Sequence, residues 1–284
     1  ALVLALESLS GLAGNRWYLE WRGQEKDFDD TILNRAEILL LLSAWPTAYV
    51  LWQWAGAEAG AGRFRTGALA VIAVAVVVIM IGVSNSNQLA ALVALVGAVF
   101  AAFTGKWLQK LLAGLVVIGF LAAPLLPTTV LAPERWAASF DEKHYSALHR
   151  LHIWNFAAQR ITDAPVIGWG LDAARRIPGG DTKLAGGGNV MSVHTHNGSL
   201  QIWLELGAVG ALIFAGLLAA LWLRIAILEE RSLRAGGTGL LLSALMVANL
   251  SFGIWQTWWM ASLALSGLLF MIAQKLKLDE RLNI

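Results

Sequence analysis

The sequence predicts an all-α protein: a polytopic transmembrane helix bundle with a large external loop that contains an amphipathic helix. Two observations support this fold class. Hydrophobic residues make up 57% of the 284 residues, and they gather in runs near the length of about 20 residues that crosses a bilayer. One long polar interval, residues 128–193, interrupts these runs, and all five histidines lie between positions 144 and 196.

Several apolar runs are predicted to be membrane-spanning helices. In chain order they cover residues 38–54, 68–83, 89–103, 108–126, 199–223, 240–254 and 260–273. A further, incomplete run stands at the start, where the chain begins with Ala1 and lacks an initiator methionine. We therefore expect an N-terminally truncated piece, in which a signal peptide cannot be judged.

These runs predict three domains. Residues 1–127 form an N-terminal group of transmembrane helices, residues 128–195 form the external loop, and residues 196–284 form a C-terminal group of helices with a short cytoplasmic tail. Because the loop is polar and the rest of the chain is suited to lipid, we expect a water-soluble reactant to be handled at the loop.

Basic residues in the short loops predict the orientation. Lys and Arg favour the cytoplasmic side of a membrane, and they share one face if each run spans once: Arg63, Arg65, Lys106, Lys110, Arg224, Arg231, Arg234, Lys275, Lys277 and Arg281. The histidine-containing loop then lies outside, together with residues 84–87, 255–259 and 15–34. The net charge of +2 reflects this topology, so we expect no nucleic-acid partner. The sequence has no cysteine, so disulfides do not hold the loop.

The external loop carries one helical pattern and one glycine-rich segment. Apolar side chains recur at helical spacing within residues 144–162, at Ala147, Leu151, Trp154, Ala158 and Ile161. This spacing predicts an amphipathic helix that lies over the membrane domain. The glycines of residues 178–180 and 186–188 predict a mobile segment, which is either a lid that admits substrate or an ordinary surface loop.

His196 is a candidate general base. If the helix that follows begins before it, His196, Leu200, Trp203, Gly207 and Gly210 share one stripe. Two glycines on a stripe let a neighbouring helix approach closely, which would fix the ring. Near a helix N-terminus the backbone dipole disfavours the imidazolium form, so a neutral ring is available to take a proton from a hydroxyl group. The structural alternative is an interfacial histidine that hydrogen-bonds a backbone carbonyl.

Arginines of the amphipathic helix predict an anion site on the same external surface. Arg150 lies one turn before Trp154, and Arg160 lies further along. A guanidinium binds phosphate oxygens in a bidentate fork and keeps its charge at an interface, which suits a lipid pyrophosphate. The alternative is contact with lipid headgroups. Arg175 and Arg176 fall in the glycine-rich segment and are expected to be solvated.

Three motifs connect these residues to a known family. They read Arg150-x3-Trp154, Pro165-x2-Gly168-x-Gly170 and His196-Asn197-x9-Gly207-x2-Gly210-Ala211. Together they resemble the bacterial O-antigen ligase and polymerase family of membrane glycosyltransferases, over about residues 35–218. The resemblance implies a multi-helix fold with a large periplasmic loop, in the bacterial inner membrane. It also implies transfer of a glycan from undecaprenyl pyrophosphate to an acceptor sugar on the periplasmic side, without a metal or other cofactor.

The family's two branches differ in their acceptor. In the ligase branch the acceptor is the lipid A core oligosaccharide, and in the O-antigen or exopolysaccharide polymerase branch it is another lipid-linked repeat unit. Matched by motif, His196 corresponds to the histidine proposed to activate the acceptor hydroxyl. Arg150 corresponds to an arginine proposed to hold the pyrophosphate, and Asn197 is assigned to the same substrate.

One position departs from the family pattern. The family carries a second arginine in a Ser-Arg-x3-Leu pattern at the external end of a span, whereas this chain reads Ser84-Asn85-Ser86-Asn87-Gln88-Leu89. Asn85 donates hydrogen bonds but brings no charge. Arg35, at another external helix end, is a candidate replacement in the pyrophosphate site. Its structural alternative is a snorkelling interfacial arginine.

Two other acidic features have alternative interpretations. The first external loop carries clustered carboxylates that would suit a divalent cation or would simply be solvated: Glu25, Asp27, Asp29 and Asp30. Glu205 is a carboxylate within an apolar run, where charges tend to be functional or paired. On a continuous helix it lies about 180° from His196, so we expect it to support another helix.

A non-enzyme alternative is a transporter of lipid-linked saccharides. Transporters tend to place polar groups and broken helices near the midplane, within internally repeated halves. This sequence has no such repeat, and its polar residues gather at one interface. The pattern therefore favours surface chemistry over alternating access.

Overall fold

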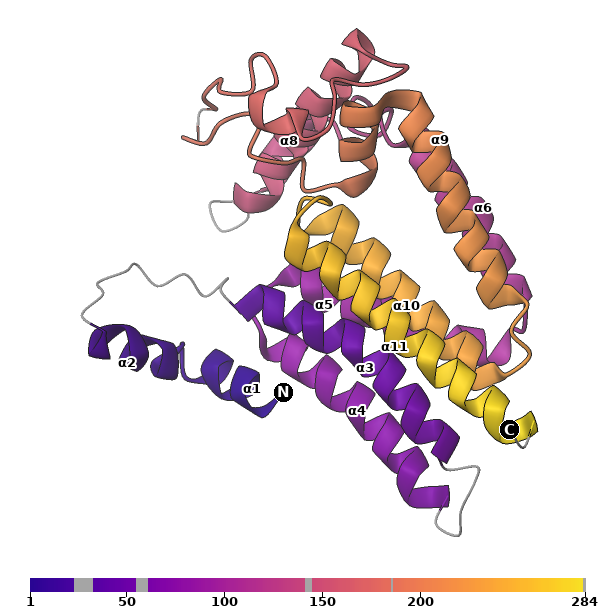
Figure 1. The fold of residues 1–284 in the computed structure, drawn as a ribbon. Helices are drawn as coiled ribbons and strands as arrows, with labels where there is room; N and C mark the ends of the chain where they lie inside the picture. Colours follow the sequence, from indigo (N-terminus) through magenta and orange to yellow (C-terminus); the bar gives the residue numbers. More distant parts are fainter. Residues whose placement is uncertain (23–32, 55–60, 141–144, 185, 283–284) are drawn as a thin grey trace. The chain divides into compact units, whose positions relative to one another are not determined.

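The structure, a computed structural model, describes residues 1–22, 33–54, 61–140, 145–184 and 186–282 (Figure 1). Within these residues the chain folds into helices and loops, and its strand-like pairing is an isolated bridge between Lys183 and Asn189. The predicted all-α fold is confirmed. The chain forms two compact units, each assembled from separate stretches.

Unit 1 comprises Ala1–Gly105, Leu228–Val247 and Met260–Ile284. It contains α1 (Leu2–Leu9), α2 (Ala13–Trp21), α3 (Asn34–Trp54), α4 (Ala61–Ile81), α5 (Asn85–Phe103) and most of α10 (Arg231–Leu250) and α11 (Thr257–Leu282). α3 packs along α4 (Figure 1). Trp45 of α3 packs against the small Ala94 and Ala98 of α5, and its Nε1 donates to Ser243 Oγ of α10 at 2.9 Å. Small residues thus let these helices approach closely.

Unit 2 comprises Lys106–Ile227 and Ala248–Trp259. Among its described residues are α6 (Trp107–Ala122), α7 (Pro133–Trp136), α8 (Tyr145–Asp163), α9 (Gly198–Ala226) and the short 3-10 helices η2 (Ala137–Ser139) and η4 (Ala173–Arg176). α6 lies alongside α9 (Figure 1), and Trp203 Nε1 of α9 donates to Phe120 O of α6 at 2.7 Å.

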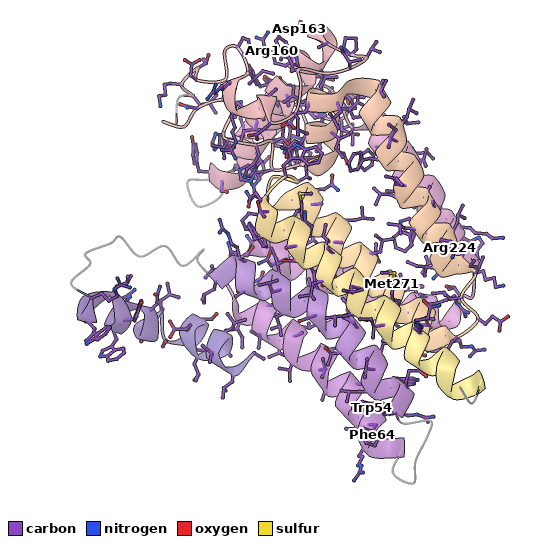
Figure 2. All side chains as sticks on the ribbon, viewed as in Figure 1. Trp54, Phe64, Arg160, Asp163, Arg224 and Met271 are labelled. Carbon is purple, nitrogen blue, oxygen red and sulfur yellow. The ribbon has the colours of Figure 1, made fainter. Side chains whose placement is uncertain are left out.

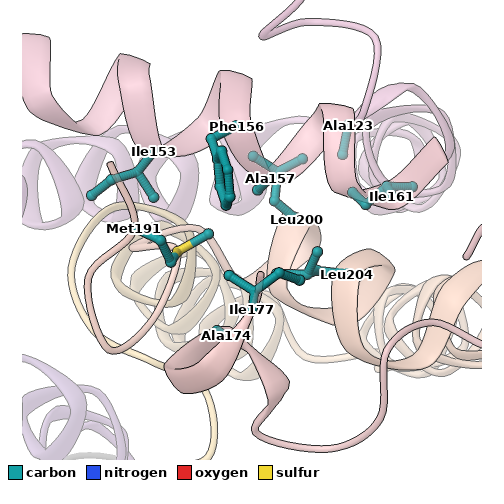
Figure 3. Packing of buried hydrophobic residues seen from close by; sticks show 10 residues of the cluster. All are labelled: Ala123, Ile153, Phe156, Ala157, Ile161, Ala174, Ile177, Met191, Leu200 and Leu204. Atoms are coloured by element: carbon teal, nitrogen blue, oxygen red, sulfur yellow. The ribbon is translucent and has the colours of Figure 1, made fainter. Parts of the chain in front are cut away.

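The core of unit 2 joins α8 to the loop that follows it and to the start of α9 (Figure 3). Its buried members are Ala123, Ile153, Phe156, Ala157, Ile161, Ala174, Ile177, Met191, Leu200 and Leu204. α8 therefore has the predicted amphipathic character, although Ala147 of the predicted stripe is exposed. His144, the first residue of the predicted helix, lies outside the described residues.

Five of the described helical segments are long and apolar enough to cross a membrane: Gly62–Ile81, Asn85–Phe103, Gly198–Ala226, Arg231–Leu250 and Thr257–Lys275. The predicted spans 38–54, on α3, and 108–126, on α6, are not among these five, and α6 is a shorter apolar helix. Large apolar side chains such as Met271 project outward from these helices, as Figure 2 shows, and such surfaces suit lipid rather than water. The predicted polytopic helical fold is confirmed.

α9 is broken at Gly207, where φ is 60° and ψ is −159°. Residues other than glycine almost never adopt this conformation. The predicted span 199–223 is therefore two helical stretches, residues 198–206 and 208–226. The sequence pattern did not predict the break, because a single glycine is tolerated within an apolar helix.

A loop segment fills the break with backbone hydrogen bonds. Two of its N–H groups donate to the carbonyl groups that end the first stretch, and two of its carbonyl groups accept from the N–H groups that begin the second. The bonds are Trp169 N to Leu204 O (2.9 Å), Gly170 N to Glu205 O (2.9 Å), Ala208 N to Pro165 O (2.8 Å) and Val209 N to Val166 O (3.2 Å). The loop thus supplies the partners that a continuous helix would have provided.

The glycines at the break permit this close approach. A Cβ at Gly207 would overlap the Val166 carbonyl group, and a Cβ at Gly168 would lie 2.5 Å from Leu206 N. At Gly210 the space is taken by the Leu206 side chain. The prediction that Gly207 and Gly210 admit a neighbouring helix is therefore wrong, because a loop and a side chain of the same helix occupy these positions.

Candidate functional site

His196 lies in the loop before α9 rather than on the helix. α9 begins at Gly198, and Asn197 caps it by accepting a hydrogen bond from Leu200 N at 3.0 Å. The φ angle of His196 is +53°, a left-handed conformation that a non-glycine residue holds only when its surroundings impose it. The predicted stripe through His196 is therefore wrong, and loop contacts set the position of the ring.

Hydrogen bonds from three side chains hold this loop. Trp154 Nε1 of α8 donates to Thr195 O at 2.9 Å. Ser192 Oγ donates to His194 O and Thr195 Oγ1 donates to Asn197 O, both at 2.6 Å. Thr195 is fully buried. The loop is thus fastened both to α8 and to itself, which gives the two histidines a defined geometry.

The His196 ring has one nitrogen committed to the protein. Its Nδ1 lies 2.7 Å from Ser251 O, and a carbonyl oxygen only accepts hydrogen bonds, so Nδ1 carries the hydrogen. In the neutral ring Nε2 is then an acceptor. Burial lowers the pKa of His196 to about 4, the Ser251 hydrogen bond raises it, and the charges of Arg150 and His149 lower it further. The ring is therefore neutral at pH 7, with a lone pair on Nε2.

His194 holds the opposite tautomer beside it. Its Nδ1 accepts the backbone N–H of His196 at 3.2 Å, so the hydrogen of the neutral ring is on Nε2. The two ring centroids lie 4.1 Å apart, edge to face. Burial lowers the pKa of His194 to about 3, with further lowering by His196, Arg175 and Arg150. The pair thus offers one Nε2 as a hydrogen-bond acceptor and the other as a donor.

Arg150 places a positive charge close to both histidines, since its charge lowers the pKa of each ring. It stands on α8 and is half-buried, and this burial lowers the pKa of its own guanidinium. Because arginine in water titrates only above about pH 12, it remains cationic here. Arg150 therefore brings a positive charge that acts on both rings, as it would on an anion beside them.

A cavity of about 710 Å³ is bordered by residues 191–193, the segment that leads to the pair, although His194, His196 and Arg150 do not line it. Its polar lining is His149, Arg175, Arg176, Asp181, Asn189 and Ser192. Val193, which also lines it, directly precedes His194. Arg175 is exposed as predicted and forms an ion pair with Asp172 at 2.8 Å. The cavity has a volume typical of small-molecule sites.

The predicted site residues fall in two groups. Arg150, His196 and Asn197 lie together in unit 2, and Asn197 Oδ1 caps α9 as described. Arg35, in the first turn of α3, and Asn85, the first residue of α5, are exposed and belong to unit 1. Their assignment to the pyrophosphate site stays a prediction.

The alternative of a divalent-cation site concerns the clustered carboxylates of the first external loop. The acidic residues of the first external loop, Glu25, Asp27, Asp29 and Asp30, lie outside the described residues. Elsewhere in the described chain, no group of three or more His, Asp or Glu side chains is arranged to hold a metal ion.

Sequence reasoning missed two residues that hold the site in place. Ser251 was not singled out, and neither was Asn249, whose Oδ1 accepts from Ser199 N (3.1 Å) and Ser199 Oγ (2.7 Å) at the start of α9. One signal was present: the polar residues Asn249 and Ser251 stand at the end of an apolar run. Polar groups at a helix end commonly satisfy another helix terminus.

Comparison with known proteins assigns the family. The family model described as O-antigen ligase matches residues 62–215, a stretch that contains Arg150 and the whole loop of His196. The chain belongs to the O-antigen ligase family. Together with the apolar helices, this membership indicates a multi-pass membrane protein.

Relatives of this O-antigen ligase family member occur in Rickettsia under the name "Putative polysaccharide ligase". The Rickettsia conorii protein is 30% identical over 188 residues, which cover 63% of this chain and 45% of the relative. The Rickettsia prowazekii protein is 30% identical over 171 residues (59% and 41%), and the Rickettsia typhi protein is 29% identical over 203 residues (68% and 48%). The chain spans a little under half the length of these relatives. No solved structure matches it.

Proposed function

We propose that this O-antigen ligase family member transfers a glycan from undecaprenyl pyrophosphate to an acceptor sugar, at the periplasmic face of the bacterial inner membrane. The observation that carries the proposal is the state of His196. Its Nδ1–H is committed to Ser251 O, and its low pKa keeps Nε2 free to accept a proton. A half-buried, oriented, neutral imidazole is a suitable general base for a sugar hydroxyl.

The reaction follows from these groups. His196 Nε2 takes the proton of the acceptor hydroxyl, whose oxygen attacks the anomeric carbon of the donor glycan. The bond from that carbon to the pyrophosphate oxygen breaks, and undecaprenyl pyrophosphate leaves with the bonding electrons. Arg150 stabilises the negative charge on the departing oxygens. Direct displacement inverts the anomeric centre, and the guanidinium supplies the positive charge that a metal ion would otherwise bring.

The alternative interpretation, in which His196 is an interfacial histidine without a catalytic role, is compatible with its contact to Ser251 O. An interfacial histidine would also hydrogen-bond a carbonyl, as His196 does with Ser251. The proposal adds a role for the other nitrogen. Support comes from the neighbouring Nε2–H of His194 and from the charge of Arg150, because an acceptor, a donor and a cation beside one another suit a hydroxyl that attacks a pyrophosphate ester.

The test is glycan transfer from an undecaprenyl-pyrophosphate donor by the full-length protein in liposomes, with products resolved by mass. His196→Gln is expected to lower the rate by about two to four orders of magnitude. The matched variant His152→Gln, on α8, is expected to keep it. Unchanged transfer by a folded His196→Gln protein would exclude the base role.

The same assay separates the remaining alternatives. A single addition to a lipid A core acceptor indicates a ligase, and a ladder of repeat units indicates a polymerase. Transport of the donor lipid across the bilayer without any glycan product would point to the transporter. A requirement for a divalent cation, seen as loss of transfer with a chelator, would contradict the metal-independent reaction.

A further inference from the structure

Glu205 is a fully buried carboxylate in the first stretch of α9, two residues before the break. Two side chains and two backbone groups hydrogen-bond to it, the backbone groups being those of Asp172 and Ala174. Gln201 Nε2 reaches Oε1 at 3.1 Å, Asp172 N reaches Oε2 at 2.9 Å, and Trp255 Nε1 also donates to Oε2. The two loops that supply Asp172 and Trp255 are therefore held to α9 by one side chain. The expectation that Glu205 supports another helix holds in part: Asp172 and Ala174 belong to the N-terminus of the short helix η4, whereas Trp255 belongs to the loop after α10.

Glu205 and Gln201 together hold the loop that follows α10. Trp255 is bound by Glu205 directly. The neighbouring Ile254 donates its N–H to Gln201 Oε1 at 3.1 Å, while the amide group of Gln201 donates to Glu205. Two consecutive residues of the loop are thus fixed to one face of α9, and Gln201 is oriented by Glu205, since its amide group can present oxygen to Ile254 only when its nitrogen faces the carboxylate.

The same loop carries Ser251, the partner of His196. Ser251 is three residues before Ile254, is buried, and accepts from His196 Nδ1 at 2.7 Å. A short path therefore runs from Glu205 through the loop to the ring. A displacement of the loop would move the Ser251 carbonyl group away from Nδ1 and would remove the contact that keeps the hydrogen on that nitrogen.

We propose that Glu205 is a positioning residue for His196. It holds the loop between α10 and α11, residues 251–256, so that Ser251 O selects the tautomer in which Nε2 of His196 is an acceptor. The proposal rests on the proposed function of His196 as a base. Glu205 itself touches neither the ring nor the cavity. Its effect is transmitted through the loop, so replacing it changes the hydrogen position on a ring that remains present and folded.

Two variants interrupt the path at different points. Glu205→Gln replaces an acceptor oxygen by an NH2 group, which then faces an N–H donor and leaves it unsatisfied. Trp255→Phe removes the indole N–H and keeps an aromatic ring against Phe214, with which Trp255 makes an edge-to-face contact. Trp258→Phe is the matched control, because it removes an indole N–H in the first turn of α11, directly after the loop, that donates to Gln256 rather than to Glu205.

The experiment measures the tautomer of His196 directly. The full chain is labelled with [15N]histidine in lipid nanodiscs, and the His196 signals are assigned by difference with His196→Gln. We expect a protonated Nδ1 in the unmodified chain and in Trp258→Phe, and a shift of hydrogen toward Nε2 in Glu205→Gln and Trp255→Phe. In the transfer assay, the last two variants should lose about ten- to a hundredfold in kcat, with little change in the KM for donor.

The outcomes separate the two proposals. If Glu205→Gln and Trp255→Phe both keep the tautomer of the unmodified chain, the positioning role is wrong, whatever their transfer rates. If the tautomer shifts as expected but the unmodified chain transfers no glycan, Glu205 positions the ring and the proposed function fails. If Glu205→Gln does not fold, Trp255→Phe against Trp258→Phe decides the question alone.

Discussion

His194 and His196 are two residues apart, yet the protein gives them opposite hydrogen positions. The backbone N–H of His196 fixes the tautomer of His194, and the carbonyl group of the distant Ser251 fixes that of His196. Neither ring needs a charged partner, so the pair keeps its tautomers wherever both rings are neutral. Because one Nε2 accepts a hydrogen bond and the other donates one, the two rings can contact different atoms of one substrate.

The pH dependence of transfer follows from the low pKa of His196, about 4. Above that value the ring is neutral and Nε2 accepts a proton; below it the ring is protonated and the base is lost. We expect the rate of transfer to stay level from about pH 8 to about pH 5 and to fall only below that. A pH–rate profile in liposomes measures this. Loss of half the rate at about pH 6.5, the ordinary pKa of a histidine side chain, would contradict a base whose pKa is lowered by its surroundings.

Arg150 is expected to act in two measurable ways. Arg150→Gln removes a charge-assisted hydrogen bond worth about 1.5–3 kcal/mol, so kcat/KM for the pyrophosphate donor should fall by about ten- to a hundredfold. Because the Arg150 charge lowers the pKa of His196, the acid limb of the pH–rate profile should also move to higher pH. Arg160, the other arginine of the predicted anion site, instead forms an ion pair with Asp163 on the same helix (Figure 2), so Arg160→Gln should change neither.

Sequence reasoning located these side chains better than it explained them. His196 and Arg150 were found from motif and helix position, and both lie in the same unit. The tautomer of His196 was out of reach, because it depends on Ser251, 55 residues later in the chain. Spacing along a chain describes neighbours on one helix, whereas a loop residue takes its geometry from whichever backbone group the fold brings to it.

At the scale of elements, hydropathy predicted where helices are but not where one of them stops. The predicted runs agree with α3 to α6 and α9 to α11 because burial in lipid requires a continuous apolar stretch. The break in α9 is invisible to this criterion, since Gly207 stands among apolar residues on both sides. Its partner, residues 165–170, is some forty positions earlier, and the pattern of that segment indicates only a turn.

Gly207 is expected to be among the least replaceable residues of α9. Gly207→Ala forces a side chain into a conformation that costs about 1–3 kcal/mol, and its Cβ would also overlap the Val166 carbonyl group. The temperature of unfolding in detergent should therefore fall. Gly216→Ala, further along α9, meets no atom within 4 Å and should be neutral or slightly stabilising. Equal stability of the two variants would argue against the break.

At the scale of the whole molecule, the distribution of charge predicts which side of the membrane each loop faces. The chain has no cysteine, so single cysteines report topology without background. Thr182→Cys, in the exposed part of the external loop, should react with a membrane-impermeant maleimide added to the periplasm. Lys106→Cys, between α5 and α6, should react only after the inner membrane is opened. The reverse pattern would place the His196 loop in the cytoplasm and would contradict the proposed reaction.

The break in α9 has a consequence for how this family can vary. All four hydrogen bonds that fill it join backbone groups to backbone groups. They therefore tolerate most side-chain substitutions but require a fixed number of residues between the bonded groups. Substitutions at Val166 or Trp169 leave the register intact. An insertion or deletion of a single residue between Pro165 and Gly170 would pair each group with the wrong partner. In this segment natural variation should therefore preserve length more strictly than identity.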